Sequence, residues 1–191
     1  MKLSVLYFLV LLFFSSCITV QFETIDFISN NLLDSIPSEL QGSYTSSDGD
    51  TLALTDKILD MGYDPFSKER SLDTLKHGSL EIAKFDDYYL LCKKEKGLWT
   101  VVPLFPNKNK LEVYYLDEDE YINRNFKDTK DENKKHDFFF SELNKITPAK
   151  KVYNDSGDID YYLINPTKKQ FKKLLENNFF SKLDELRRIG N

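Results

Sequence analysis

The sequence predicts an α+β protein that is mainly β, an antiparallel meander of strands followed by two C-terminal helices. Apolar residues recur with period two in runs of about four to eight residues, separated by short breaks rich in Gly, Asn and Asp. After Ile164 the apolar spacing becomes helical. The chain has fifteen Phe and eleven Tyr among 191 residues, which is enough apolar surface for a packed core, and its length suits one domain.

The first residues of the chain have the pattern of an export signal. Lys2 gives a positive start, Leu3 to Phe14 are almost wholly apolar, and two serines precede Cys17. A secretory signal has a basic start, an apolar core of roughly 7–15 residues and small residues at the cleavage site. We therefore expect residues 1–16 to be a signal peptide and the mature chain to begin at Cys17.

The end of this segment resembles a bacterial lipoprotein signal. Ser15, Ser16 and Cys17 match that pattern, whereas Phe14 departs from the usual leucine. The resemblance implies that the Cys17 thiol takes a diacylglyceryl group and that the new amine is acylated, for example with palmitate. Because each buried methylene contributes about 0.8 kcal/mol, two or three chains hold a protein firmly on a membrane. The resemblance therefore implies a lipid-anchored protein of the cell envelope that is held at the outer membrane and faces the periplasm.

Two other interpretations of this segment stay open. In one, Cys17 is an ordinary residue near a plain secretory cleavage site. In the other, the uncharged stretch from Leu3 to Val20 remains as an uncut anchor, since a membrane span needs about 20 residues. All three interpretations take the domain out of the cytoplasm.

Residues 17–37 are expected to be a lipidated tether, with a short helix from Asp26 or Ser29 as the alternative. Residues 38–164 are expected to form the antiparallel β domain. The expected strands are Thr51–Thr55, Ser79–Phe85, Tyr88–Lys93, Leu98–Phe105 and Leu111–Leu116, followed by a hairpin of Lys150–Tyr153 and Ile159–Ile164. Pro103 should lie near a strand end or edge, because it has no N–H to donate.

The strand pattern is interrupted between Asp117 and Pro148. Residues 127–137 form a dense mixed-charge run, which we expect to be a solvated loop with His136 on the surface. Phe138 to Phe140 are apolar and are expected to dock on the domain as a short helix that continues to Ile146.

Residues 165–191 are expected to form two helices that pack on the β domain. Asn165-Pro166 suits the cap and first position of a helix, or else Thr167 and Gln170 make a capping box. Ser181 is expected to cap the second helix. This segment is basic on a chain whose net charge is −5, and we interpret the excess as a solvated helix face. The acidic balance of the whole chain argues against nucleic acid as a partner.

The entry to the first strand is similar to the start of a lipocalin-like domain, which has a Gly-x-aromatic sequence there. Gly42-Ser43-Tyr44 matches it, although the family usually has Trp in place of Tyr44. The resemblance implies a partial antiparallel barrel whose interior takes a small apolar ligand, and no catalytic residue.

The sequence carries no recognised catalytic signature, so we predict no catalytic residue, no metal ligand and no cofactor. His77 and His136 stand far apart, and Cys92 is expected to be a buried inert thiol, with a reactive thiol next to Lys93 as the alternative. Three acidic clusters are interpreted as solvated turns, namely Asp48–Asp50, Asp117–Glu120 and Asn154–Asp160. Cys17 is the single site residue that we predict.

The expected function is that of a non-enzymatic binding or assembly module, which would need an exposed apolar patch. The alternative is a carrier, which needs an enclosed apolar cavity of roughly 300 Å³ or more. A hydrolase with an acidic site is the third possibility, and it needs two carboxylates that converge in a cleft.

Overall fold

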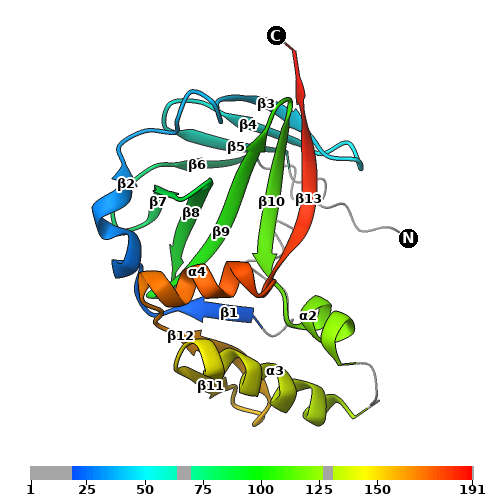
Figure 1. Cartoon of the computed structure of the whole chain (residues 1–191). Helices are drawn as coiled ribbons and strands as arrows, with labels where there is room; N and C mark the ends of the chain where they lie inside the picture. The colour runs from blue at the N-terminus through cyan, green and yellow to red at the C-terminus, as the bar shows by residue number, and fades with distance from the viewer. Residues whose placement is uncertain (1–18, 64–69, 127–130, 191) are drawn as a thin grey trace.

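The computed structural model describes residues 19–63, 70–126 and 131–190. The predicted signal peptide and the predicted lipidation site Cys17 lie outside these described residues. The fold is mainly β, a strongly curled antiparallel half-barrel sheet with a few helices (Figure 1). The predicted fold class, α+β with a lipocalin-like partial barrel, is confirmed.

The bounds of the elements follow the chain. The strands are β1 (Thr19–Phe22), β2 (Leu32–Leu33), β3 (Gly42–Thr45), β4 (Thr51–Leu54), β5 (Ile58–Tyr63), β6 (Arg70–Thr74), β7 (Leu80–Phe85), β8 (Tyr88–Glu95), β9 (Leu98–Asn107), β10 (Lys110–Leu116), β11 (Ala149–Tyr153), β12 (Ile159–Ile164) and β13 (Phe180–Ile189). The helices are the 3₁₀ helix η1 (Asp26–Asn31), α2 (Glu118–Asn125), α3 (Glu132–Ile146) and α4 (Lys168–Glu176).

The sheet follows the order β11-β12-β1-β9-β10-β13-β3-β4-β5-β6, and β8, β7 and β2 branch from β9. Neighbouring strands are antiparallel except for β1 and β12, which are parallel. The strands predicted from alternation are confirmed for β4 and for β7 to β10, as is the β11–β12 hairpin. Tight turns such as the one at Asp86, where φ is 49°, connect the meander.

Pro103 lies in the middle of β9 and not near a strand end, so that prediction is wrong. Its position has a simple explanation in the pairing of β9. One side of the strand pairs with β1 at Trp99 and with β10 from Leu104 onward, so Pro103 falls between the two contacts. On the other side Pro103 lies opposite Leu90 of β8.

The predicted tether is wrong from Thr19 onward. β1 lies inside the sheet between β9 and β12, and both Val20 and Phe22 are buried. η1 then confirms the alternative of a short helix from Asp26, and it buries Ile28. Val20 and Phe22 alternate with polar residues, which is a short strand pattern. This pattern directly follows the apolar signal segment, and periodicity alone does not show where the signal ends and the strand begins.

The predicted second C-terminal helix is also wrong. The first helix forms as α4, where Thr167 and Gln170 make the capping box. α4 ends at Glu176, Asn178 with its φ of 56° turns the chain, and β13 begins at Phe180. This long strand pairs with β10 on one side and β3 on the other, so it joins the two halves of the sheet. Tertiary pairing therefore overrides a helical spacing in this segment.

The predicted solvated loop is helical from Glu132 onward, because α3 begins there and extends to Ile146. Asp131 caps this helix, and its carboxylate accepts a hydrogen bond from the Lys134 backbone N–H. The predicted docking of the Phe138–Phe140 segment is confirmed, since Phe139 and Leu143 are fully buried.

The apolar interior has two parts. The first is packed between the sheet and the helices, and its aromatic centre contains Phe22, Phe85, Phe139 and Phe171. The second fills the curve of the half-barrel with side chains from β3 to β5, β7 to β10 and β13. α4 and β1 cross the lower end of the barrel strands, with α3 and the β11–β12 hairpin beyond them (Figure 1).

Candidate functional site

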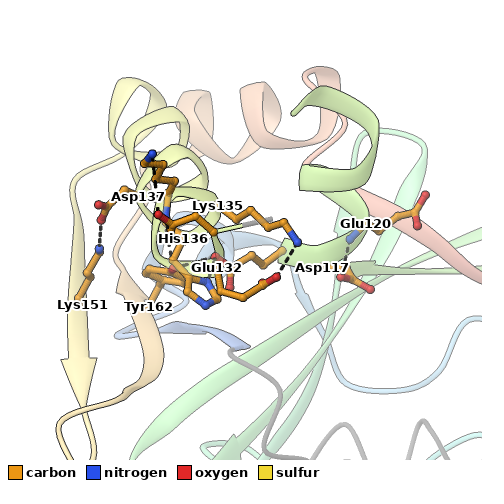
Figure 2. Close-up of polar contacts among 11 residues, drawn as sticks. Asp117, Glu120, Glu132, Lys135, His136, Asp137, Lys151 and Tyr162 are labelled. Carbon is orange, nitrogen blue, oxygen red and sulfur yellow. Dashed lines mark hydrogen bonds and ion pairs between the residues drawn. The ribbon is translucent and has the colours of Figure 1, made fainter. Parts of the chain in front are cut away.

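Three polar side chains from three different elements meet beneath α3. Glu118 comes from the first turn of α2. His136 comes from α3 and Tyr162 from β12 (Figure 2). The Glu118 Oε1 atom lies 2.9 Å from His136 Nδ1 and accepts a hydrogen bond of 2.8 Å from the Tyr162 hydroxyl. The Tyr162 hydroxyl also lies 3.4 Å from the His136 carbonyl oxygen. This arrangement, here called the Glu118 cluster, ties α2, α3 and the sheet together.

Local signals in the sequence place these side chains. Asp117 is the N-cap of α2 and accepts a 3.0 Å hydrogen bond from the Glu120 backbone N–H. The cap turns Glu118 inward, where its side chain is only 4% exposed. His136 lies three residues before Phe139, so both occupy the inner face of α3.

Burial controls the electrostatics of the cluster. It raises the pKa of Glu118 above the ordinary value, against the lowering effect of the hydrogen bonds from His136 and Tyr162. Burial also raises the pKa of Tyr162, and the Glu118 carboxylate adds to that effect. The Tyr162 hydroxyl therefore stays protonated and remains a donor to Glu118.

A cavity of about 330 Å³ opens beside the cluster, between α3 and the β11–β12 hairpin. Its described lining includes His136, Asp137, Lys151, Tyr153 and Asp158. The Lys151 Nζ lies 2.6 Å from Asp137 Oδ1, and this ion pair holds the pKa of Asp137 below its ordinary value. The cavity is thus lined by donors and acceptors that could hold a small polar group.

The cluster fixes the orientation of the His136 ring. The Nδ1 atom of His136 faces Glu118, and His136 also lines the cavity. An imidazole held by a buried carboxylate can exchange a proton or hydrogen-bond a ligand. The described residues that line this cavity include no Ser, Thr or Cys, the side chains that usually act as nucleophiles. The imidazole and the polar lining of the cavity can therefore hydrogen-bond a small polar ligand.

Two carboxylates, Asp137 and Asp158, line the cavity as a hydrolase would require. A general acid needs a raised pKa. The Lys151 ammonium instead lowers the pKa of Asp137. Glu118 does have a raised pKa, but it lies behind His136 and is not part of the lining.

The second histidine also faces a buried glutamate. His77 Nδ1 lies 3.0 Å from Glu81 Oε1, next to a cavity of about 410 Å³. The His77 side chain is 90% exposed, whereas that of His136 is 22% exposed. Little packing holds His77, so the Glu118 cluster is the better-ordered site.

The structure also places the other residues that the sequence singled out. Cys92 is buried, as predicted, and burial raises the pKa of its thiol well above the ordinary value. Lys93 forms ion pairs with Asp73 and Glu95. Asn154–Asp160 contains the predicted turn, which Asn154 Oδ1 closes by accepting from the Ser156 and Asp158 N–H groups.

The interpretation of Asp117–Glu120 as a solvated turn is wrong, because this segment caps and begins α2. The prediction of His136 as a surface residue in a loop is also wrong, because His136 lies in α3 and its side chain is only 22% exposed. The available signal was the spacing of His136, Phe139 and Leu143 by three and four residues, which extends the helical face to His136. The mixed charges around it concealed this face.

Three cavities among the described residues bear on the carrier hypothesis, which needs an enclosed apolar cavity. The cavity beside His136 has a mostly polar lining, and the one beside His77 is lined by four leucines together with charged side chains. An apolar cavity between β5 and β9, lined by Leu59, Met61 and Val102 among others, measures about 20 Å³. That volume is far below the roughly 300 Å³ expected of a ligand site, because side chains fill the curve of the half-barrel.

Within residues 19–63, 70–126 and 131–190, no group of three or more His, Cys, Asp and Glu side chains could hold a metal ion. In the same ranges no helix is long and apolar enough to cross a membrane. Comparisons with models of known protein families, with curated proteins and with solved structures each found no match.

Proposed function

We propose that this protein is a lipid-anchored protein of the bacterial cell envelope, held at the outer membrane on its periplasmic side. Its folded domain serves as a non-enzymatic binding or assembly module. The observation that carries this proposal is the Ser15-Ser16-Cys17 sequence directly after an apolar segment. A thiol at that place in a lipoprotein signal receives the lipid.

Exposed apolar side chains support a module that meets a protein partner. Ile58 is 41% exposed on β5, and Leu72 is 53% exposed on β6. Leu72 lies opposite Asp60, and Ile58 lies opposite Thr74. Ile58 and Leu72 therefore share one face of the sheet as diagonal neighbours. We call them the β5–β6 patch, and they occupy the last two strands of the sheet path.

The polar cavity beside His136 offers a second kind of binding site. The Glu118 carboxylate fixes the ring, and the cavity supplies Lys151 and Asp158 as further polar groups. The described lining of this site contains no Ser, Thr or Cys side chain, and we favour the binding of a small polar ligand there over hydrolysis.

The test is the mass of the mature protein. In wild type we expect a mature chain that begins at Cys17, carries the mass of its acyl chains, and fractionates with membranes. Cys17→Ala should lose the lipid mass, because the acceptor thiol is gone. Cys92→Ala is the matched control and should keep the lipid, because Cys92 is buried. Equal lipid incorporation in wild type and Cys17→Ala would overturn the proposal.

A further inference from the structure

We propose that the domain rests on the bilayer through one defined end and that its opposite end points away from the membrane. The inference rests on the proposed lipid anchor at Cys17. The anchor end is defined by Thr19, Asp117 and Tyr161. The far end is defined by the β9–β10 turn at Lys108 and Asn109.

Backbone pairing brings the three residues of the anchor end together. Thr19 pairs in parallel with Tyr161 of β12, and it forms an isolated antiparallel bridge with Asp117. The start of β1, the start of α2 and the first half of β12 therefore converge. These three elements are far apart in the sequence.

The chain between the anchor and this end is very short. Thr19 is two residues beyond Cys17, and an extended chain spans at most about 3.6 Å per residue, or about 7 Å here. A lipid on Cys17 thus holds Thr19 next to the membrane surface. The predicted tether of some twenty residues would have left the domain free to point in any direction.

β1 cannot detach to lengthen this link without disturbing the fold. It pairs with β12 along its length and with β9 at Phe22. Val20 is 4% exposed and Phe22 is 1% exposed, so removing β1 would expose two core side chains. The domain is therefore attached rigidly at Thr19.

β10 gives the distance between the two ends. It leads from the β9–β10 turn to Asp117, which is eight residues beyond Asn109. At about 3.3 Å per residue in a strand, Asn109 and Asp117 lie about 26 Å apart. The β9–β10 turn lies at the end of the half-barrel opposite β1 (Figure 1).

The chemistry of the anchor end identifies the lipid surface that it fits. Tyr153 is 57% exposed near this end, and tyrosine suits a membrane–water interface. Asp119, Glu120 and Asp160 are exposed acidic residues on the segments that pair with Thr19. Glu120 forms an ion pair with Arg124, which leaves Asp119 and Asp160 as the main negative charges there. Charges within a Debye length of about 8–10 Å repel an anionic surface. The anchor end therefore fits a surface of zwitterionic head groups.

The cavity beside His136 lies at the same end. Ile159 lines this cavity and precedes Tyr161, the partner of Thr19, by two residues. A polar ligand of this cavity would thus be bound close to the membrane surface.

Two single-cysteine labels on the full lipidated chain test this orientation. Asp119→Cys places a fluorophore at the anchor end and Asn109→Cys places one at the far end. Both positions are exposed, the Cys17 thiol carries the lipid, and the Cys92 thiol is buried. The labelled proteins are reconstituted into phosphatidylcholine vesicles with a nitroxide quencher on a fraction of the head groups.

We expect several-fold stronger quenching at Asp119→Cys than at Asn109→Cys. Replacing part of the zwitterionic lipid with an anionic lipid should weaken the quenching at Asp119→Cys, and about 1 M salt should restore it. Equal quenching at both positions, or stronger quenching at Asn109→Cys, would overturn the orientation. Stronger quenching at Asp119→Cys on anionic vesicles would overturn the assignment of a zwitterionic surface.

Flotation and intact mass separate this inference from the proposed function. A chain that carries no lipid and does not float with vesicles refutes the anchor itself. A chain that carries lipid and floats, but shows equal quenching at both labels, keeps the anchor and refutes the orientation. Circular dichroism of each variant establishes that its fold is retained.

Discussion

At the residue scale, the molecule uses buried polar pairs to fix its helices. Glu118 is nearly inaccessible to solvent, yet it accepts hydrogen bonds from Tyr162 and lies against His136. Such a pair is costly to break, because the remaining partner is left buried without a bond. The contacts of Glu118 hold α2 and α3 in one fixed orientation on the sheet.

The raised pKa of Glu118 predicts a pH dependence of stability. Its carboxyl has an ordinary pKa of 4.5, so above that pH ionisation favours the unfolded chain, where the group is solvated. The stability of wild type relative to Glu118→Gln should therefore fall as pH rises above 4.5. Urea unfolding of both proteins at a series of pH values from about 4 to 7 measures this difference.

Glu118→Ala serves as the contrasting variant. It leaves the Tyr162 hydroxyl with only the longer 3.4 Å contact to the His136 carbonyl oxygen and should cost about 1–3 kcal/mol in the free energy of unfolding. Repeating the comparison of wild type with Glu118→Gln in a His136→Gln background removes the imidazole that lies against Glu118. A stability difference between wild type and Glu118→Gln that does not change with pH would contradict the prediction.

At the element scale, two strands near the ends of the chain, β1 and β13, decide how the sheet is assembled. β1 links β9 to β12 and so brings the β11–β12 hairpin into the sheet. β13 links β10 to β3 and so closes the curve of the half-barrel. Arg188 at the end of β13 donates to the Tyr44 hydroxyl at 2.8 Å, and Gly42 leaves room for its side chain. The two ends of the described chain are therefore structural parts of the sheet.

The role of β1 predicts a large effect of a single substitution near the N-terminus. Phe22 is 1% exposed, and its ring centroid lies 6.0 Å from that of Phe171 in α4. Phe22→Ala should cost about 3–5 kcal/mol in the free energy of unfolding, because it leaves a cavity in the core. Thermal and urea unfolding measure this loss.

The control is the neighbouring exposed residue. Glu23→Ala keeps the backbone hydrogen bond of 2.9 Å to Ile164 and should change stability by no more than about 0.5 kcal/mol. Similar small effects for Phe22→Ala and Glu23→Ala would show that residues 19–23 do not belong to the sheet.

At the scale of the whole molecule, the two surfaces that we propose for interaction lie at different places on one sheet. The anchor end faces the lipid in the proposed orientation. The β5–β6 patch lies on the strands that end the sheet path, far from β11 and β12 in the strand order. A filled half-barrel separates the two surfaces. This arrangement suits a module that joins a membrane to a protein partner.

The patch predicts where a protein partner binds. Chemical cross-linking of wild type in intact cells should yield a partner adduct, and Leu72→Ser should reduce it several-fold because the exposed apolar contact is lost. Tyr153→Ser, which also removes an exposed apolar side chain but from β11, should keep the adduct. An adduct of equal yield in wild type and Leu72→Ser would refute this role of the patch.

The sequence by itself determined the elements whose signals are local. Period-two alternation and tight turns define β7 to β10 and the β11–β12 hairpin, and the Thr167–Gln170 capping box defines the start of α4. These signals depend on neighbours within a few residues, so a single sequence is enough to read them.

Only the tertiary structure decided the places of β1, β13 and the Glu118 cluster. β1 and β13 are short or ambiguous patterns, and they become strands because partners more than 60 residues away along the chain present free edges to them. Glu118 and His136 lie in charged runs that resemble solvated segments, and α3 and β12 bury them. Long-range pairing and burial depend on which strand edges and core surfaces the rest of the folded chain presents. The spacing of neighbouring residues does not encode these.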